Sequence, residues 1–497
     1  MFRAAQGRSA LRAALFFFAM AAWAQSDGDL AAKSHQAKEL MGMGRFADAV
    51  GLYRELCRAM PANVGLRLNL ALALHMSGQH QEAIPQFERV LQAEPNSLPA
   101  LLSLGAARLE TGDPARAVAP LEKVVTLQPS NTNARGMLAN ALLSLDRPQD
   151  AAVHFRRLTA LTPDDAKAWF GLGQTYEALA NHAFEELDKT AQGSPEWLAL
   201  VGQSRLGQRQ YRSAFFFYRQ ALDKHPNLAG AHAALAAIYQ ATEHPDWAAA
   251  EQRKETALAP PNCARDKAAC DFAAGRLLDA AASKSLYWRA RAYNDLALQA
   301  FSRLGQLPES VELHALKAEM LGNHGQHVEA AAEWQAALKL APGDPRLEHE
   351  LAKAFYLGHD YRRALPAVQE LLKRDAGAPD LQFFAGDSLL QLERAEEAIP
   401  YLQAALKADP GLMPAHAALG IALARVGQPG AAIPHLEAAL ESDEDGSLHY
   451  QLSRACQAAG ESEKARRVLA AYQEIQKRAE AEKLSLENQA RITAPPP

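Results

Sequence analysis

The chain has 497 residues, of which 48% are hydrophobic, 7% aromatic and 22% charged. This apolar content excludes a disordered chain, and the small aromatic share favours helices rich in Ala and Leu over sheets. The 52 basic and 57 acidic side chains give a net charge of -5, which argues against nucleic acid or an anionic membrane as the partner.

The first two dozen residues are typical of a secretory signal peptide. Three arginines precede an apolar run from Ala13 to Ala22, and Ala22-Trp23-Ala24 then matches the small-x-small cleavage pattern. At about ten residues the run is too short to span a bilayer. We predict a signal peptide over residues 1–24, export to the periplasm or the cell exterior, and no membrane span in the mature chain. An uncleaved N-terminal anchor is the alternative.

A 34-residue repeat organises the rest of the chain. An alanine such as Ala83 recurs at this spacing, with a bulky residue four places later, here Phe87. A small residue stands twelve places before the alanine, here Ala71, and a proline twelve places after it, here Pro95. Small residues let two antiparallel helices approach closely, the bulky residue fills the space beside them, and the proline ends the second helix.

The segments Trp169-x2-Leu172-Gly173-x2-Tyr176 and Ala83-x3-Phe87…Pro95 carry a known signature. With them, residues 30–479 resemble the tetratricopeptide repeat (TPR) family. The resemblance implies an all-α fold, a right-handed α-α superhelical solenoid of helical hairpins whose concave groove binds proteins or peptides. It divides the chain into an N-terminal array over 25–262 and a C-terminal array over 311–479. The repeats of the N-terminal array lie at about 30–63, 64–97, 98–131, 132–165, 166–194, 195–228 and 229–262. Those of the C-terminal array lie at about 311–344, 345–378, 379–412, 413–446 and 446–479.

The repeat register breaks twice. Residues 166–194 predict a first helix followed by an atypical second helix around Phe184 and Leu187. Residues 263–310 form a linker that predicts two long helices, near Asp271–Ser283 and Leu286–Leu304. The aromatic residues of the linker are either its core or a docking surface. Residues 480–497 are expected to be the end of a charged capping helix and a loose Pro-rich tail.

The family resemblance places the partner-binding residues at fixed positions of each first helix. In the N-terminal array these positions are apolar: Leu68, Leu72, Met76, Leu102, Leu109, Leu143 and Phe170. In the C-terminal array they include charged and polar residues: Arg346, Lys353, Tyr356, Asp387 and Arg454. The alternative for the leucines is packing against the neighbouring repeat.

The cysteines permit one local disulfide. Cys263 and Cys270 lie beside Pro260-Pro261 and either form a bond in an oxidising compartment or remain two thiols. In a straight helix the two sulfurs would be roughly 10 Å apart, so a bond requires a bend. Cys57 and Cys456 occupy core positions and are expected to be buried thiols.

The sequence contains no catalytic or cofactor-binding motif. His314, His324 and His327 fall at different places along a hairpin, so we expect exposed histidines and no metal site there. We therefore predict a non-enzymatic protein-binding scaffold of the cell envelope without cofactors. One alternative is a polysaccharide- or peptidoglycan-associated factor, which exposed aromatics in residues 263–310 would favour. The other is an enzyme with its site in that segment.

Overall fold

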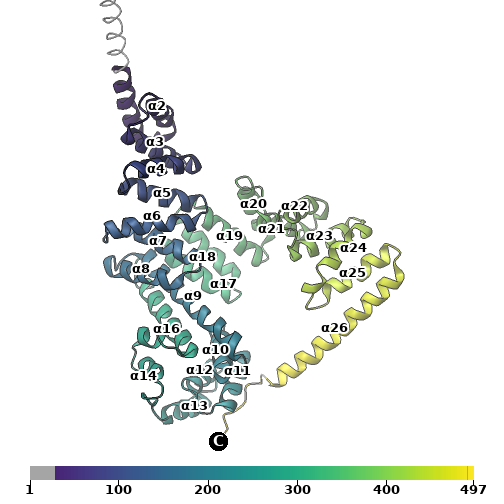
Figure 1. Ribbon diagram of the computed structural model, residues 1–497. Coiled ribbons are helices and arrows are strands. Elements are labelled where there is room, and N and C mark those ends of the chain that lie inside the picture. The colour runs from purple at the N-terminus through teal and green to yellow at the C-terminus, as the bar shows by residue number, and fades with distance from the viewer. Residues whose placement is uncertain (1–27, 490, 497) are drawn as a thin grey trace, which may run out of the picture. The chain divides into compact units, whose positions relative to one another are not determined.

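The computed structural model describes residues 28–489 and 491–496, in which every regular element is a helix. The predicted signal peptide lies outside the described residues. The chain divides into two compact units, which meet within one helix: unit 1 ends at Leu179 and unit 2 begins at Ala180. Each is built from helical hairpins (Figure 1). The all-α fold of TPR-type hairpins is therefore confirmed.

Unit 1 is a succession of hairpins, and from Phe46 to Leu161 each helix packs on the next in chain order. A helix over residues 28–42 comes first. The helices after it are α2 (Phe46–Ala59), α3 (Val64–Met76), α4 (His80–Ala93), α5 (Leu98–Glu110), α6 (Pro114–Leu127), α7 (Thr132–Ser144), α8 (Pro148–Leu161) and the first part of α9 (Ala166–Ala191).

Unit 2 contains the remaining hairpins and the linker. Its helices after α9 are α10 (Pro195–Gly207), α11 (Tyr211–Lys224), α12 (Ala231–Ala241), α13 (Pro245–Ala257), α14 (Lys267–Ala273), α15 (Leu277–Ala281), α16 (Leu286–Leu304), α17 (Val311–Asn323), α18 (His327–Leu340), α19 (Pro345–Leu357), α20 (Tyr361–Leu372), α21 (Pro379–Gln391), α22 (Ala395–Ala408), α23 (Met413–Arg425), α24 (Pro429–Ala438), α25 (Ser447–Ala458) and α26 (Ser462–Gln489).

The repeated small and bulky residues form the core between the two helices of each hairpin. In α3 and α4, Ala71, Ala83 and Phe87 are fully buried. In the next hairpin Gly105 lies so close to Leu121 that an added Cβ atom would be 2.6 Å from the leucine Cγ. The predicted spacing therefore corresponds to close contacts between helices, because small residues face the bulky side chain.

Different side chains fix the start of successive hairpins in the same way. Near the start of a first helix, one polar side chain hydrogen-bonds the carbonyl oxygen six residues earlier. The pairs are Arg67–Pro61 at 2.7 Å, Arg135–Pro129 at 2.6 Å, Trp169–Pro163 at 2.8 Å, His232–Pro226 at 3.1 Å, Gln382–Ala376 at 2.8 Å and His416–Pro410 at 3.2 Å. These bonds satisfy carbonyl groups in the loops, where the backbone lacks helical partners.

The first register break is one long helix, so the prediction of two helices was wrong there. α9 runs unbroken for 26 residues. Residues 174–190 contain neither Gly nor Pro, and nothing in them ends a helix once it has begun.

The linker contains one of its two predicted long helices. α16 has the expected bounds, but the helix expected near Asp271–Ser283 is divided into the short α14 and α15. Gly275 separates them with φ +71°, a conformation that only glycine adopts easily. Arg276 then reaches back to the buried Asp271, with Nη2 2.6 Å from Oδ1. The hydrogen bonds from Lys267 and Arg276 lower the pKa of Asp271.

A disulfide joins Cys263 to Cys270, with the two Cα atoms 5.6 Å apart. The bend that this bond requires precedes α14, whose first turn is capped by the Asp266 side chain at Ala269 N, 2.9 Å. Cys57 and Cys456 are free thiols; Cys456 is buried as expected, whereas Cys57 is only half-buried, so the expectation was wrong for Cys57.

The C-terminus also differs from expectation. The capping helix is continuous with the second helix of the last hairpin, since both belong to α26. The tail expected to be loose is held, because the carbonyl oxygens of Thr493 and Pro496 accept hydrogen bonds from α12 and α13. No helix in the described part of the chain is long and apolar enough to cross a membrane.

Candidate functional site

The predicted groove residues of unit 1 differ in accessibility. Met76 is 54% exposed, whereas Phe170 is only 7% exposed and so belongs to the packed interior, because little of its ring is accessible to a partner. The predicted leucines are half-buried: Leu68, Leu72, Leu102, Leu109 and Leu143. Leu68 and Leu72 pack against the buried core cluster of the first hairpins. The leucines thus combine a packing role with an accessible edge.

In unit 2 the structure brings two predicted residues together. Tyr356 of α19 donates its hydroxyl hydrogen to Asp387 Oδ2 of α21 at 2.7 Å. The Tyr356 ring lies 4.6 Å from the ring of Phe384. Burial, followed by the nearby Asp387 carboxylate, raises the pKa of Tyr356, so its hydroxyl stays a donor at neutral pH. This contact joins the first helices of two successive hairpins.

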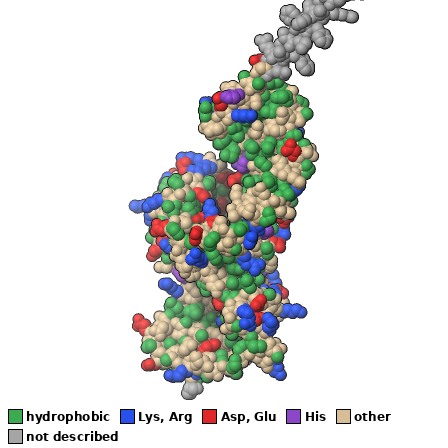
Figure 2. Space-filling view, turned by 90° about the vertical axis from the view of Figure 1, so that its left-hand side faces the viewer, with side chains coloured by type: hydrophobic (Ala, Val, Ile, Leu, Met, Phe, Trp, Pro, Cys, Tyr) green, Lys and Arg blue, Asp and Glu red, His purple; other side chains and the backbone are tan. Residues whose placement is uncertain are grey.

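The other predicted residues of unit 2 lie elsewhere on its surface. Arg346 is exposed in the first turn of α19. Lys353 lies 3.6 Å from the Glu350 carboxylate, and Arg454 lies 6.0 Å from the centre of the Tyr450 ring. Side chains of both charge signs are interspersed on the face shown in Figure 2.

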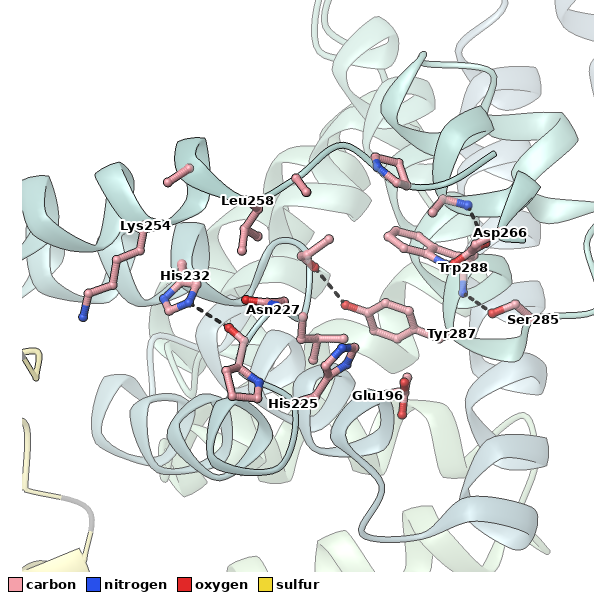
Figure 3. Close-up of a pocket in the computed structure, with 17 residues that line it drawn as sticks. Glu196, His225, Asn227, His232, Lys254, Leu258, Asp266, Ser285, Tyr287 and Trp288 are labelled. Carbon is pink, nitrogen blue, oxygen red and sulfur yellow. Dashed lines mark hydrogen bonds between the residues drawn. The ribbon is translucent and has the colours of Figure 1, made fainter. Parts of the chain in front are cut away.

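A cavity of about 750 Å³ opens in unit 2 between α12, α13 and α16 (Figure 3). The loop from His225 to Ala229 lines it, and α16 supplies Tyr287 and Trp288. The polar lining residues come from several elements: Glu196, Asn227, His232, Lys254, Asp266 and Ser285. Residues from five helices and the loops between them therefore surround one space.

The aromatic wall of the cavity is held by hydrogen bonds. Trp288 donates its indole N–H to Asp266 Oδ2 at 3.0 Å, while the other oxygen of Asp266 caps α14. Ser285 caps α16 by accepting from Trp288 N at 3.4 Å. Trp288 and Tyr287 are 8% and 6% exposed. They line the cavity with the small accessible part of their side chains and belong mainly to the core.

Arg291 joins this wall to the loop opposite. Its guanidinium lies over the rings of Phe272 and Trp288, 4.7 and 5.2 Å from their centres, and donates to Ala229 O at 2.9 Å. Gly230 lies beside this contact with φ +85°, and a Cβ there would lie 2.7 Å from the guanidinium, which would then have to move. The glycine thus permits the turn that faces the cation–π contact.

On the other side of the cavity, a buried carboxylate organises the polar groups. Glu251, 1% exposed, contacts His232 Nδ1 and accepts from Lys254 Nζ at 3.1 Å. Glu255 accepts from the backbone N–H groups of Gly230 and Ala233, at 2.8 and 3.1 Å. A carboxylate at a helix N-terminus stabilises it, so Glu255 fixes the start of α12.

The polar groups that the linker contributes to the cavity have structural partners. Asp266 and Ser285, the linker's polar groups in the cavity, are both engaged as helix caps. The exposed aromatic platform expected for a sugar-binding factor is not formed by Tyr287 and Trp288, since both rings are buried. The expectation of exposed histidines was wrong: His314 is buried and contacts Glu333 at 2.7 Å, and His324 and His327 are half-buried, with His324 in contact with Gly207 O at 2.8 Å.

Sequence reasoning missed the cavity. Its residues come from the last repeat of the N-terminal array and from the linker, and no repeat position marks them. One signal was available: Glu251 follows Ala248 by three residues on the core-facing side of a helix, where a charged residue requires a partner.

Solved TPR structures resemble parts of this chain. MamA from Desulfovibrio magneticus RS-1 is 21% identical over 34% of this chain and 95% of that chain, with a TM-score of 0.31. A TPR protein from Parabacteroides merdae is 12% identical over 66% and 98%, with a TM-score of 0.33. YrrB, described as a TPR protein with an unusual peptide-binding site, is 22% identical over 34% and 87%, with a TM-score of 0.30.

No curated protein matches the chain. Two family models do match it, and both describe the tetratricopeptide repeat. One matches residues 35–97, 77–132 and 349–412, and the other matches residues 108–174. Helical hairpins occupy these same residues in the structure. The chain therefore carries tetratricopeptide repeats over residues 35–174 and 349–412.

Proposed function

We propose that this chain is a non-enzymatic scaffold that binds protein or peptide segments along the first helices of its repeats. TPR proteins are generally scaffolds of this kind. The observation that carries the proposal is a pair of half-buried leucines, Leu68 and Leu102, at the same position in successive repeats. Met76, 54% exposed, lies one helical turn beyond the half-buried Leu72 and extends this apolar surface along α3. Spaced apolar side chains suit a segment with spaced apolar anchors.

The test compares partner capture by four forms of the full chain. Met76→Glu and Leu102→Glu place a charge on the proposed surface, and Val153→Glu is the matched control, because Val153 is 55% exposed on a second helix. Affinity capture from a cell-envelope extract, read by mass spectrometry, should recover the same proteins with wild type and Val153→Glu. Met76→Glu and Leu102→Glu should lose them while circular dichroism remains unchanged.

Two results would contradict the scaffold. Equal capture by all four forms would show that the first helices do not contact the partner. Retention of a purified envelope glycan, with no protein partner recovered by any form, would favour a polysaccharide-associated factor.

We also propose that the scaffold works outside the cytoplasm. Residues 1–24 support this proposal through their arginines, apolar run and Ala22-Trp23-Ala24 site. Mass spectrometry of the protein from a periplasmic or secreted fraction should find Gln25 as the first residue. A chain that keeps residues 1–24 and stays with the cytoplasmic fraction would contradict export.

A further inference from the structure

The C-terminal segment Arg491–Pro496, here called the tail, returns to the second hairpin of unit 2. α26 extends beyond the last hairpin, of which it is the second helix, and the tail that follows it reaches the region of α11–α13 (Figure 1). The tail is not helical. Its Ile492 packs against the buried cluster that contains Tyr239. A cleft of about 940 Å³ separates it from the start of α11, and His244 and Ile492 are among the lining residues.

Two side chains of unit 2 donate hydrogen bonds to the main chain of the tail. Tyr239 donates its hydroxyl hydrogen to Thr493 O at 2.6 Å, and Lys254 Nζ donates to Pro496 O at 2.7 Å. The two carbonyls are three residues apart. A proline-rich segment favours the polyproline II helix, which has three residues per turn, so carbonyls at this spacing emerge on one side. Both bonds therefore suit an extended proline-rich backbone.

The two donors are held in place by the fold. Tyr239 is fully buried, and its ring meets the edge of Trp247 at 5.6 Å. Burial raises the pKa of Tyr239 to about 12, which keeps the hydroxyl protonated at neutral pH. Lys254 is positioned by Glu251, itself buried and in contact with His232. A rigid aromatic surface with fixed donors binds a stiff segment at a small cost in conformational entropy.

We propose that the surface formed by Tyr239, Trp247 and Lys254 is a binding site for extended proline-rich segments, and that the chain's own tail occupies it. The recognised chemistry is a branched apolar anchor, as at Ile492, followed by carbonyl acceptors three residues apart in a Pro-rich stretch. A partner segment with these features competes with the tail. The site goes beyond the proposed scaffold function and uses none of the residues on which that function depends.

Lys254 connects the site to the cavity described above. The same ammonium group binds Glu251 and the Pro496 carbonyl, and Lys254 also lines the cavity. A segment that takes the place of the tail at Lys254 therefore contacts a residue of the cavity lining.

The experiment measures binding of a fluorescent peptide with the sequence of residues 489–497 by anisotropy. It uses the full chain, the full chain with Ile492→Asp, and the control Val153→Asp, which introduces the same charge at a branched side chain that is 55% exposed and lies outside the site. The peptide should bind Ile492→Asp at least about tenfold more tightly than wild type or Val153→Asp, because a tail seated in the same chain competes with it. Adding Tyr239→Phe to Ile492→Asp should weaken binding again by about tenfold, since one hydrogen bond is lost.

Hydrogen exchange supplies the second readout. Residues 231–241 should exchange faster in Ile492→Asp than in wild type or Val153→Asp, because the tail covers α12. Equal peptide binding by wild type and Ile492→Asp, or no binding by either, overturns the proposal, and so does equal exchange in both. Partner capture through Met76 and Leu102 is measured separately, so either proposal can fail while the other stands.

Discussion

A Cβ atom built on Gly386 in α21 would lie 2.6 Å from Cγ of Leu402 in α22, closer than real Cβ contacts. Gly420 and Leu436 in the next hairpin repeat this relationship, also at 2.6 Å. Both leucines are fully buried. The glycine therefore belongs to the packing of the hairpin, because its missing side chain leaves the space that the leucine fills.

Gly386→Ala should destabilise unit 2 by about 1 to 3 kcal/mol, because the added methyl group overpacks the hairpin. Leu402→Ala alone should cost about 2 to 5 kcal/mol by leaving a cavity. The double variant should lose less free energy of unfolding than the sum of the two single losses, because the methyl group added at Gly386 occupies space left by the shortened Leu402 side chain. Urea unfolding followed by circular dichroism measures all three, and strict additivity would show that the two residues do not share this space.

Gly230→Ala should destabilise the chain, whereas Gly51→Ala should stabilise it slightly. At Gly230 the new side chain meets the Arg291 guanidinium and the backbone must keep φ +85°. Gly51 lies within α2 with nothing near its added Cβ, so alanine there should contribute about 0.5 to 1 kcal/mol. Thermal melting of the two variants should move in opposite directions. A shift of the same sign and size in both would contradict the role assigned to Gly230.

The protein should become less stable as the pH decreases, because of the contact between His416 and His435. Their Nδ1 atoms are 2.9 Å apart. Burial, followed by the proximity of His416, lowers the pKa of His435 below the usual 6.5. The unfolded chain therefore binds more protons than the folded one as pH falls through 6.5, and the contribution of His435 is lost. Melting temperatures from pH 8 to pH 5 should fall less steeply in His435→Gln than in wild type. Parallel curves would contradict this role.

Reduction of the disulfide between Cys263 and Cys270 should weaken the linker without unfolding the arrays. Closing a loop this short contributes about 2 kcal/mol in the chain-entropy account. Hydrogen exchange at residues 261–273 should rise after reduction, and the double variant Cys263→Ser/Cys270→Ser should show the same increase. Cys456→Ser serves as the control, since that thiol is free. Unchanged exchange on reduction would show that the bond does not restrain this segment.

The repeated hairpins could be predicted from the sequence because their contacts are local. Gly105 and Leu121 belong to neighbouring helices of one hairpin, and their spacing along the chain directly encodes their contact. The same reasoning correctly bounded α16. It failed where the register breaks: α9 lacks any residue that would stop it, and Gly275 divides a segment that looked like one helix.

The accessible surfaces were decided by the tertiary structure. Phe170 occupies a position that the repeat assigns to the groove, but packing buries it, and Met76 stays exposed. The cavity joins residues from Glu196 to Trp288, which no period relates. The contact between Tyr239 and Thr493 spans 254 residues and joins a buried hydroxyl to a main-chain carbonyl, which every residue possesses. Side-chain periodicity therefore determined the hairpins of this protein, whereas backbone recognition and long-range burial, which leave no periodic trace, determined the cavity and the contact of the tail.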